Sequence, residues 1–416
     1  MHRALYTLLI TALLPFAWLR LQWRSRKEPG YGRHIAERFG HYAFAPSRPI
    51  IWLHAVSVGE TRAAIPLVNA LKARYPNHQL LITHMTPTGR ATSETLFGDT
   101  VLRCYLPYDA PFAMGRFLTH FRPTLGLLME TELWPNLIDA CRTNNIPLWL
   151  VNARLSQKSA SRYARVKTLT AECLAKLTGI CAQTPADAER LTQLGANSVA
   201  ICGNMKFDVK PPEPMLQLGS ALRLRFGEMR PIFLAASTRE GEEILILDAI
   251  EKMSVPNMLT VIVPRHPQRF DEVAALIQKR GLMLQRRSTD APVNATTQVV
   301  LGDSMGEMFA YYAACDVAFI GGSLLPLGGQ NLIEACAVGK PVLIGPHTFN
   351  FTEATEQAIA YGAAYRVEDP QALADAATRL LNNSIAREEM GQKGLLFTRS
   401  HQGAVERILN TISGVQ

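Results

Sequence analysis

The amino-acid sequence predicts an α/β protein made of two doubly wound, Rossmann-like domains behind an N-terminal membrane-anchor helix. Its 416 residues are too many for one ordinary hydrophobic core, so two domains of roughly 150 to 200 residues are expected. From Ile50 onward, short apolar runs alternate with helical patterns, which is typical of βαβ units in parallel sheets. A separate apolar run opens the chain.

The opening run covers residues 4–19, A-L-Y-T-L-L-I-T-A-L-L-P-F-A-W-L, and a basic cluster from Arg20 to Lys27 follows it. Its sixteen uncharged residues reach only ~24 Å as a helix, short of the ~30 Å hydrocarbon core. A full span therefore needs Leu21 and arginines that extend to the interface, and a helix lying in the headgroup layer is the alternative. A cleaved signal peptide is disfavoured, because no A-x-A site follows the run and its basic flank is on the wrong side.

The positive charge is concentrated near this run. The chain carries a net charge of +8, of which residues 1–48 contribute +6 and the remainder only +2. The basic residues therefore lie beside the apolar run, not on a nucleic-acid-binding face, and no nucleic-acid partner is expected. By the positive-inside bias, they place the rest of the chain at the cytoplasmic leaflet of the inner membrane.

Two sets of buried strands are expected, each strand followed by a helix. The first set covers residues 50–55, 80–84, 101–106, 125–129, 148–151 and 179–182, and the second covers 232–236, 259–263, 299–301, 317–320 and 342–344. Two such domains facing each other form a cleft between the carboxyl ends of their sheets, where ligands of these folds bind.

A polar, proline-rich stretch, F-D-V-K-P-P-E-P, interrupts the rhythm near the middle of the chain and is the best linker. The expected segments are an anchor over 1–24, a first Rossmann-like domain over 25–208, a linker over 209–214, a second Rossmann-like domain over 215–395, and a C-terminal helix over 396–416 that crosses back to the first domain.

Glu60 is the candidate general base. It follows the first expected strand through a short turn and stands immediately before a helix expected to begin near Thr61. A carboxylate there projects from the first βα turn and is well placed to take a proton from an attacking hydroxyl. The alternative is a helix N-terminal carboxylate that the helix dipole stabilises, which would lower its pKa and weaken it as a base.

Two further candidates follow other elements of the first domain. Glu130 and Glu132 end the fourth expected strand in M-E-T-E-L-W-P-N, and on an extended chain they point to opposite sides, so only Glu130 is favoured. The alternative is that one acid caps a helix and the other is solvated. Lys206, in G-N-M-K-F-D, could neutralise a substrate carboxylate or phosphate, although a surface lysine is the common alternative.

The second domain contains a glycine-rich stretch that reads as a phosphate-holding turn followed by a short helix. Its small residues let a ligand approach the backbone, and they are Gly321, Gly322, Ser323, Gly328 and Gly329. Gln330 or Asn331 can begin a helix whose free N–H groups favour an anion, and Asn331 and Glu334 would face the same ligand. A purely structural turn is the alternative.

Two more turns of the second domain carry groups suited to a phosphate. The stretch A-S-T-R-E-G-E-E over 236–243 follows a strand and opens a helix, so its hydroxyls and N–H groups are expected to form another anion nest. Arg265 ends the next strand between prolines and can bind phosphate or carboxylate through two N–H groups.

Several classes of protein are disfavoured by missing motifs. The sequence has no H-E-x-x-H, D-x-D, Walker A or G-x-S-x-G pattern, which argues against a zincin, a D-x-D metal-dependent sugar transferase, a P-loop enzyme and an α/β-hydrolase. The seven cysteines are scattered and have no metal-ligand spacing, which suits a reducing compartment without zinc or a disulfide framework. No metal site and no cofactor are expected.

Seven motifs, in this order, resemble those of the Kdo transferases of lipopolysaccharide synthesis, where Kdo is 3-deoxy-D-manno-octulosonic acid. They are H-A-V-S-V-G-E over 54–60, M-E-T-E-L-W-P-N over 129–136, G-N-M-K-F-D over 203–208, S-T-R-E-G-E-E over 237–243, P-R-H-P over 264–267, M-G-E over 305–307 and G-G-Q-N-L-I-E over 328–334. The resemblance covers essentially the whole chain, including the anchor.

The resemblance implies a GT-B glycosyltransferase that moves Kdo from CMP-Kdo to a lipid A precursor with inversion, without a metal, at the cytoplasmic face of the inner membrane. The first domain would bind the acceptor and the second would bind CMP-Kdo. The implied catalytic residues are Glu60 as general base, with Glu130 and Lys206 supporting the transition state. The implied CMP contacts are Pro264, Arg265, Met305, Gly306, Glu307, Asn331, Leu332, Ile333 and Glu334.

Two positions depart from the family pattern: Gln330 stands where many relatives have His, and Ala335 stands where they have Pro. Glutamine cannot titrate, so a charged side chain has no role at that position here. Two alternatives remain at this stage, a nucleotide-sugar epimerase on the same scaffold and a non-catalytic, membrane-tethered nucleotide-sugar binder. The anchor argues against the first, and the second predicts that Glu60 is dispensable.

Overall fold

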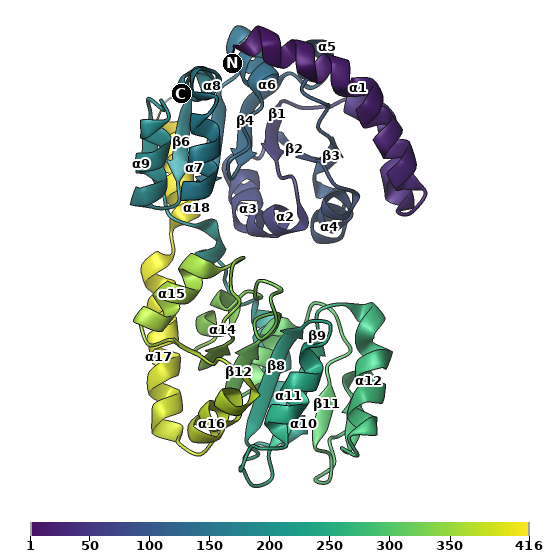
Figure 1. The fold of residues 1–416 in the computed structure, drawn as a ribbon, viewed down its shortest axis with the longest axis vertical. Helices are drawn as coiled ribbons and strands as arrows, with labels where there is room; N and C mark the ends of the chain where they lie inside the picture. Colours follow the sequence, from purple (N-terminus) through teal and green to yellow (C-terminus); the bar gives the residue numbers. More distant parts are fainter. Residues whose placement is uncertain (1, 415–416) are drawn as a thin grey trace. The chain divides into compact units, whose positions relative to one another are not determined.

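The chain folds into two compact units, each built on a parallel sheet (Figure 1). The computed structural model describes residues 2–414. Unit 1 comprises Met1–Asp208 and Gln402–Gln416, and unit 2 comprises Val209–His401. The cleft expected between two such domains stays a prediction, and each unit is described by itself.

Unit 1 contains a seven-stranded parallel sheet in the order β3-β2-β1-β4-β5-β6-β7. This order reverses direction between β1 and β4, as in doubly wound folds, where ligands bind beyond the carboxyl ends of the strands. The strands are β1 (Ile50–His54), β2 (Gln79–His84), β3 (Leu102–Tyr105), β4 (Pro123–Met129), β5 (Leu148–Ala153), β6 (Gly179–Ala182) and β7 (Val199–Ile201).

Helices cover both faces of this sheet and bury an apolar core against each. One core includes Phe117, Leu137 and Leu174, and the other includes Leu67 and Ile408. The helices are α1 (Arg3–Ser25), α2 (Val58–Ala63), α3 (Ile65–Arg74), α4 (Pro87–Phe97), α5 (Pro111–Phe121), α6 (Pro135–Thr143), α7 (Gln157–Ala164), α8 (Lys167–Lys176), α9 (Pro185–Gln193) and α18 (Ala404–Ser413), with short 3-10 helices η1 (Pro29–Gly32), η2 (Ile35–Phe39), η3 (Gly98–Thr100) and η4 (Met205–Phe207).

Unit 2 repeats the design with strands in the order β10-β11-β9-β8-β12-β13-β14. These strands are β8 (Ile232–Thr238), β9 (Leu259–Pro264), β10 (Leu284–Arg286), β11 (Val299–Leu301), β12 (Val317–Ile320), β13 (Val342–Ile344) and β14 (Ala364–Arg366). Its helices are α10 (Glu213–Phe226), α11 (Glu242–Ile250), α12 (Phe270–Lys279), α13 (Met308–Ala314), α14 (Ile333–Ala337), α15 (Thr352–Ala360), α16 (Pro370–Leu381) and α17 (Ser384–His401), with η5 (Pro267–Arg269) and η6 (Arg287–Thr289).

All eleven strands expected from the sequence are present, and the structure adds β7, β10 and β14. Each of these three has three residues and lies at an edge of its sheet. An edge strand is covered less completely than a central one, so its residues need not form a continuous apolar run. The residues of β10, for example, are all only partly buried.

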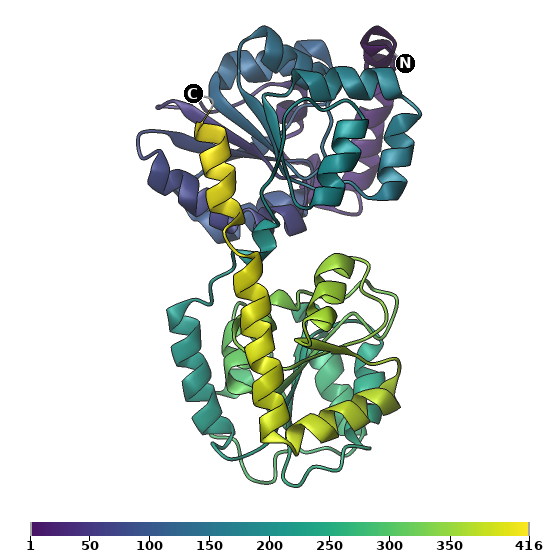
Figure 2. The same cartoon turned by 90° about the vertical axis from the view of Figure 1, so that its left-hand side faces the viewer.

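The last part of the chain contains two helices where a single helix over 396–416 was expected. The helices α17 and α18 are separated at Gly403, whose φ of +89° breaks the helical path (Figure 2). The carboxylate of Asp208 accepts hydrogen bonds from the backbone N–H groups of Gly403 and Val405, both at 2.6 Å, and so caps α18. The linker is also shorter than expected, because α10 begins at Glu213, inside the segment 209–214.

The N-terminal helix α1 is long and apolar enough to cross a membrane. Its 23 residues have a mean hydropathy of 1.6 over the most apolar 18-residue window. Leu21 is the one residue of α1 that is classed as buried within the described structure. Length and composition therefore agree with the expected anchor, and the contacts that α1 makes are described below.

Candidate active site

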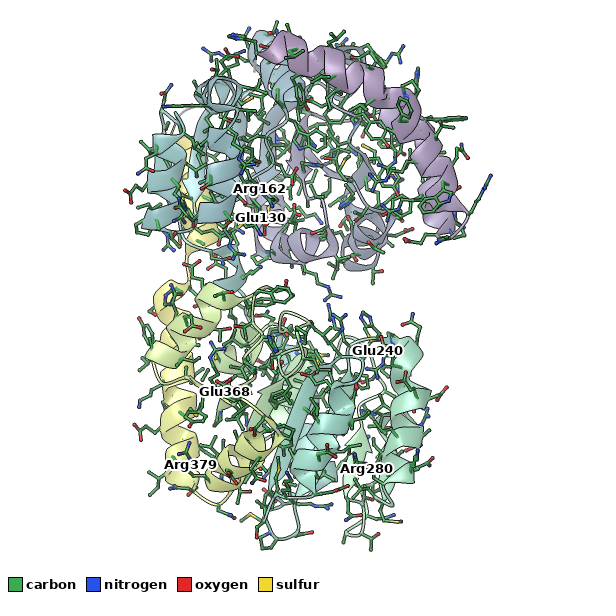
Figure 3. All side chains as sticks on the ribbon, viewed as in Figure 1. Glu130, Arg162, Glu240, Arg280, Glu368 and Arg379 are labelled. Atoms are coloured by element: carbon green, nitrogen blue, oxygen red, sulfur yellow. The ribbon has the colours of Figure 1, made fainter. Side chains whose placement is uncertain are left out.

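The carboxyl edge of the unit 1 sheet brings Glu60 and Glu130 together. Glu60 is in α2, which follows β1, and Glu130 comes directly after β4 (Figure 3). Because β1 and β4 are parallel neighbours, with His54 opposite Leu128, both chains emerge at the same edge. The two carboxylates are close enough for the charge of Glu130 to raise the pKa of Glu60.

Glu60 is a buried carboxyl with an unusual affinity for its proton. Its exposed fraction is 8%. Burial is the main cause that raises its pKa from 4.5 to about 7, and the negative charges of Glu130 and Glu132 act in the same direction. A hydrogen bond from the Val56 N–H to Oε2, at 2.8 Å, opposes this rise. The result is a carboxyl that exchanges its proton near neutral pH, as a general base requires.

Both sequence interpretations of Glu60 hold in part. Ser57 is the N-cap of α2, and its hydroxyl accepts from the Glu60 N–H, so Glu60 is a helix N-terminal residue, as the structural alternative stated. That alternative also predicted a lowered pKa. The direction is wrong, because removal from water outweighs the favourable helix terminus.

Glu130 has a left-handed backbone, with a φ of +55°. The argument that Glu130 and Glu132 point to opposite sides of an extended chain is therefore wrong at its premise, and the charges of both reach Glu60. The carboxylate of Glu132 accepts a hydrogen bond from the Trp134 indole N–H at 3.0 Å. Glu132 is thus tied to its neighbour, while Glu130 remains the candidate.

Lys206 completes the group of predicted catalytic residues. It lies in η4, and its pKa is lowered chiefly by burial, while the charges of Glu130 and Glu60 raise it. The three residues are 146 positions apart along the sequence at most, yet they influence one another electrostatically within unit 1. The fold therefore brings together all three catalytic residues that the motifs nominated.

Sequence reasoning missed two residues that support Lys206. Asn152 has a φ of +53°, and its side-chain oxygen accepts from the Met205 N–H at 3.0 Å, which fixes the start of η4. The positive charge of Arg154 lowers the pKa of Lys206. Both follow the buried part of β5 in V-N-A-R, and polar residues just past a buried strand were the available signal.

In unit 2, Arg265 and Glu334 approach a common neighbour. Arg265 follows β9, and its backbone N–H donates to the Thr238 carbonyl at 2.9 Å, so the strand end is fixed beside β8. Arg265 and Glu334 both act on the buried Tyr312 hydroxyl, whose pKa is raised mainly by burial. Residues 69 positions apart are thus brought to one region of unit 2.

The segment from Met305 to Glu307 forms a turn before α13. Gly306 has a φ of +83°, which an L side chain rarely adopts. The Glu307 carboxylate accepts from the Ser304 hydroxyl at 2.6 Å and from Arg287 at 3.4 Å. Because this carboxylate is occupied, the exposed Met305 side chain and the turn backbone are the groups best placed to meet a ligand.

Asn331 and Glu334 lie side by side, as their spacing predicted. The Asn331 amide donates to Glu334 Oε1 at 3.1 Å, and its oxygen accepts from the Ile333 N–H at 3.1 Å. The Leu332 and Ile333 side chains are fully buried, so only their backbone groups can reach a ligand. The helix begins at Ile333, and not at Gln330 or Asn331 as expected.

The glycine-rich turn is not the open anion nest that the sequence suggested. The backbone N–H groups of Gly322, Ser323 and Leu324 all donate to the carboxylate of Glu242, at 2.6, 2.9 and 3.0 Å. Glu242 is fully buried. The protein itself thus supplies the anion, and the nest is a structural element.

The second expected nest, over 236–243, is filled in the same way. Glu242 also accepts from the Arg239 N–H at 3.2 Å, and Glu243 accepts from the Thr238 hydroxyl at 2.7 Å. Arg269 binds both oxygens of Glu243, at 2.6 and 3.0 Å. The prediction that this turn holds a ligand phosphate through these groups is therefore wrong.

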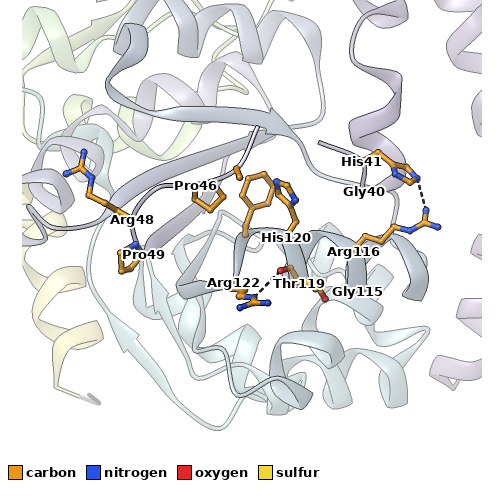
Figure 4. A pocket seen from close by; sticks show the side chains of 12 residues that line it. Gly40, His41, Pro46, Arg48, Pro49, Gly115, Arg116, Thr119, His120 and Arg122 are labelled. Carbon is orange, nitrogen blue, oxygen red and sulfur yellow. Dashed lines mark hydrogen bonds between the residues drawn. The ribbon is translucent and has the colours of Figure 1, made fainter. Parts of the chain in front are cut away.

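A cavity of about 920 Å³ lies elsewhere in unit 1 (Figure 4). Its lining includes Arg48, Pro49, Arg116 and Arg122. Arg48 and Pro49 precede β1, and Arg122 follows α5, which places the cavity at the amino ends of the strands. Glu60, Glu130 and Lys206 do not line it, so volume is no guide to the reacting groups here.

The chain matches two family models and several known proteins. Residues 33–209 match the model described as 3-deoxy-D-manno-octulosonic-acid transferase (kdotransferase), and residues 242–396 match glycosyl transferases group 1. The chain is 45% identical to 3-deoxy-D-manno-octulosonic acid transferase of Bordetella pertussis, covering 99% of each chain. It is 39% identical to the Haemophilus influenzae protein of the same name, covering 99% of this chain and 98% of that one.

Among solved structures, UDP-GlcNAc 2-epimerase from Neisseria meningitidis has a similar fold, with a TM-score of 0.60 and 16% identity. The match covers 88% of this chain and all of that one. At this identity the likeness concerns the fold alone.

Two doubly wound parallel sheets, together with a buried acid, a second acid and a lysine at one carboxyl edge, define a glycosyltransferase of the GT-B type. The full-length identity to two curated relatives makes the assignment specific. The chain belongs to the family of 3-deoxy-D-manno-octulosonic acid transferases, the enzymes that transfer Kdo in lipopolysaccharide synthesis. The epimerase and the non-catalytic binder are not favoured.

Proposed function

We propose that this protein transfers Kdo from CMP-Kdo to a hydroxyl of a lipid A precursor, with inversion, in a single displacement and without a metal ion. The observation that carries the proposal is the Glu60 carboxyl, which is almost fully buried, has a pKa of about 7, and lies beside Glu130 and Lys206. A hydroxyl needs such a group, because it is a poor nucleophile until its proton is removed.

In the proposed step, Glu60 takes the proton of the acceptor hydroxyl as its oxygen forms a bond to the anomeric carbon of Kdo. The bond from that carbon to the phosphate oxygen breaks, and CMP leaves with the electron pair. Positive oxocarbenium character develops on the sugar, and the negative charge of Glu130 would stabilise it, by analogy with glycoside hydrolysis. Lys206 would offset the Kdo carboxylate or the leaving phosphate.

Unit 2 would bind the donor. Arg265 is a cation suited to the phosphate of CMP, and the backbone of Leu332 and Ile333 can donate or accept, since the side chains are buried. Asn331 and Glu334, joined at 3.1 Å, would contact the nucleoside. Pro264, Met305, Gly306 and Glu307 complete the proposed CMP contacts.

The acceptor explains an apolar helix at the N-terminus. A lipid A precursor is held in a bilayer by its acyl chains, so an enzyme that acts on it benefits from being bound at the same surface. The helix α1 has the length and hydropathy for membrane association. We therefore place the protein at the inner membrane, with both units on the cytoplasmic side.

The test is to incubate purified protein with CMP-Kdo and a defined lipid A precursor and to measure the product mass. The expected product is the precursor plus one or more Kdo residues, with CMP released in equal number. A parallel reaction with EDTA should proceed at the same rate. Release of free Kdo without lipid modification would contradict transfer to lipid A, and loss of activity in EDTA would contradict only the metal-free step.

A further inference from the structure

The helix α1 has two different faces along its whole length. The residues that unit 1 covers, at least in part, recur every three or four positions: Arg3, Tyr6, Thr7, Ile10, Leu14, Ala17, Leu21 and Arg24. This is the spacing of one helix face. The helix therefore lies along unit 1 instead of projecting from it, and Figure 1 shows it curving over the unit.

Polar side chains dock the first turns of α1. The Tyr6 hydroxyl donates to Asp109 at 3.0 Å, and the Thr7 hydroxyl donates to the Asn136 side-chain oxygen at 2.7 Å. Asp109, with an exposed fraction of 2%, also accepts from the backbone N–H of Asn136 at 3.0 Å. One turn earlier, Arg3 forms an ion pair with Asp139 at 2.7 Å. These contacts join α1 to the start of α6.

The last turns of α1 are also attached. Leu21 is 5% exposed, and the Arg24 guanidinium lies 3.9 Å from the centre of the Tyr31 ring. The chain then turns through η1, where Gly30 packs so closely on Pro87 that a Cβ at Gly30 would lie 2.8 Å from the Pro87 Cβ. The helix is thus held at both ends.

The attachment points lie at the edge of the sheet that carries Glu60 and Glu130. Asp109 follows β3, Asn136 is in the first turn of the helix after β4, and Pro87 begins the helix after β2. In a parallel βα unit, each of these positions is at the carboxyl end of its strand. The helix α1 therefore runs across the loops of the catalytic edge.

The opposite face of α1 is apolar and uncovered. The large exposed side chains on it are Leu5, Leu8, Leu9, Leu13, Phe16, Trp18, Leu19 and Trp23, with exposed fractions from 45% to 66%. In the described residues, these are eight of the twenty exposed large hydrophobic side chains, within one helix. Exposed cations, Arg20, Arg26 and Lys27, follow at its C-terminal end.

An apolar stripe with tryptophans and basic residues at one end complements a bilayer surface with anionic headgroups. From the two faces of α1 we infer that the helix lies in the plane of the membrane surface, with its N-terminus on the cytoplasmic side, and does not span the bilayer. This inference rests on the proposed membrane association and specifies its geometry.

A spanning helix would be incompatible with the docked face. To cross the bilayer, α1 would have to leave unit 1, which would break the bonds of Tyr6, Thr7 and Arg3 and expose the groups that they cover. Asp109 would lose a buried partner, and Thr7 would enter the hydrocarbon without one. The in-plane position keeps every contact and still buries the apolar stripe.

The in-plane position also has a consequence for the reaction. Because α1 crosses the loops beyond β2, β3 and β4, membrane contact holds the catalytic edge of unit 1 beside the lipid headgroups. The acceptor sugar is itself a headgroup, so its hydroxyl would approach Glu60 while the acyl chains stay in the bilayer. A flexible spanning anchor would only tether the enzyme and would leave that edge free to turn away.

The test is labelling of a cysteine at the N-terminus in inverted inner-membrane vesicles, whose cytoplasmic face is outward. The seven native cysteines are all buried, so they give little background with a membrane-impermeant maleimide. His2→Cys is the test variant, since the His2 side chain is 82% exposed. Glu240→Cys, on an exposed residue of unit 2, is the control that should always be labelled.

We expect His2→Cys to be labelled without detergent, as fast as Glu240→Cys within about threefold. Protection of His2→Cys until detergent is added would overturn the in-plane helix and leave the proposed reaction untouched. A protein that does not stay on salt-washed vesicles at all would contradict the proposed membrane association, which separates the two failures.

A second measurement probes the apolar face itself. Leu8→Glu with Phe16→Glu should lower the membrane-bound fraction by about tenfold or more, because both side chains are 66% exposed and would bury a charge in lipid. Ile385→Glu, at a 76% exposed site of unit 2, should leave binding unchanged. Equal binding of all three proteins would show that the exposed face of α1 does not enter the membrane.

Discussion

Ser57 and Glu60 hydrogen-bond to each other in both directions. The Glu60 N–H donates to Ser57 Oγ at 3.4 Å, and the Ser57 hydroxyl donates to Glu60 Oε1 at 3.0 Å. The arrangement is related to a capping box, in which a helix-terminal acid and hydroxyl satisfy each other. Here it holds the proposed base in one orientation before any substrate arrives.

Replacing Glu60 by Gln should abolish most of the chemical step without preventing donor binding. The amide keeps the size of the side chain but cannot accept a proton, so kcat should fall by about 10² to 10⁴. The measurement is the single-turnover rate with saturating substrates, together with CMP affinity by calorimetry. Glu94→Gln, at an exposed position on α4, is the matched control. Turnover of the Glu60 variant near that of the wild type would remove Glu60 as the base.

The rate should depend on pH through Glu60. With a pKa of about 7, the carboxyl is protonated and inactive in acid, so the rate should rise with pH and reach half of its plateau near pH 7. The residual rate of Glu60→Gln should lack this transition. A wild-type profile that is flat between about pH 5 and about pH 9 would contradict the assignment.

Stability should show the opposite trend with pH. The folded-state pKa of Glu60 is raised from 4.5 to about 7, so the folded protein binds the proton more tightly than the unfolded chain. Its contribution is fully present below pH 4.5 and is lost as the pH rises through about 7. The unfolding free energy of the wild type, relative to Glu60→Gln, should therefore decline across this window in urea titrations.

Lys206→Ala should lower kcat by about 10² if its charge supports the leaving phosphate or the Kdo carboxylate. The same change removes a positive charge from the neighbourhood of Glu130 and Glu60, so the midpoint of the pH profile should move upward. Lys206→Arg should restore the midpoint more than the rate, because its charge is similar but its shape differs. An unmoved midpoint in Lys206→Ala would contradict the electrostatic role.

Two arginines near the end of β9 should respond differently to replacement by alanine. Arg265→Ala should raise the KM for CMP-Kdo by about tenfold to a hundredfold with a smaller change in kcat. Arg269→Ala should instead destabilise the fold by about 3 to 5 kcal/mol, because it leaves the buried Glu243 without its cation. Kinetics and urea unfolding of both variants separate these effects, and a reversal of the pattern would refute both assignments.

Much of the protein could be predicted from its sequence where one physical signal dominates. Central parallel strands are buried on both faces and form apolar runs, so all eleven expected strands are present. The candidate site was predicted because Glu60, Glu130 and Lys206 each follow such a run or close the first domain. The edge strands β7, β10 and β14 lack that signal.

Other features depend on partners that no local pattern identifies. The glycines of the turn at 321–324 correctly indicate close approach of an anion to the backbone, but that anion is Glu242, some 80 positions earlier. The left-handed backbone of Glu130 likewise cannot be read from M-E-T-E, where extended alternation was the reasonable expectation. In both cases a tertiary contact, and not local propensity, decides the geometry.

The return of α18 to unit 1 has a consequence for synthesis of the chain. Ile408 and Ile412 lie in the same core as Leu67 and Leu71, so the first unit to emerge from the ribosome has to wait for the final residues to complete its interior. A premature stop codon within the last dozen or so codons would thus damage the N-terminal half of the enzyme, leaving unit 2 intact.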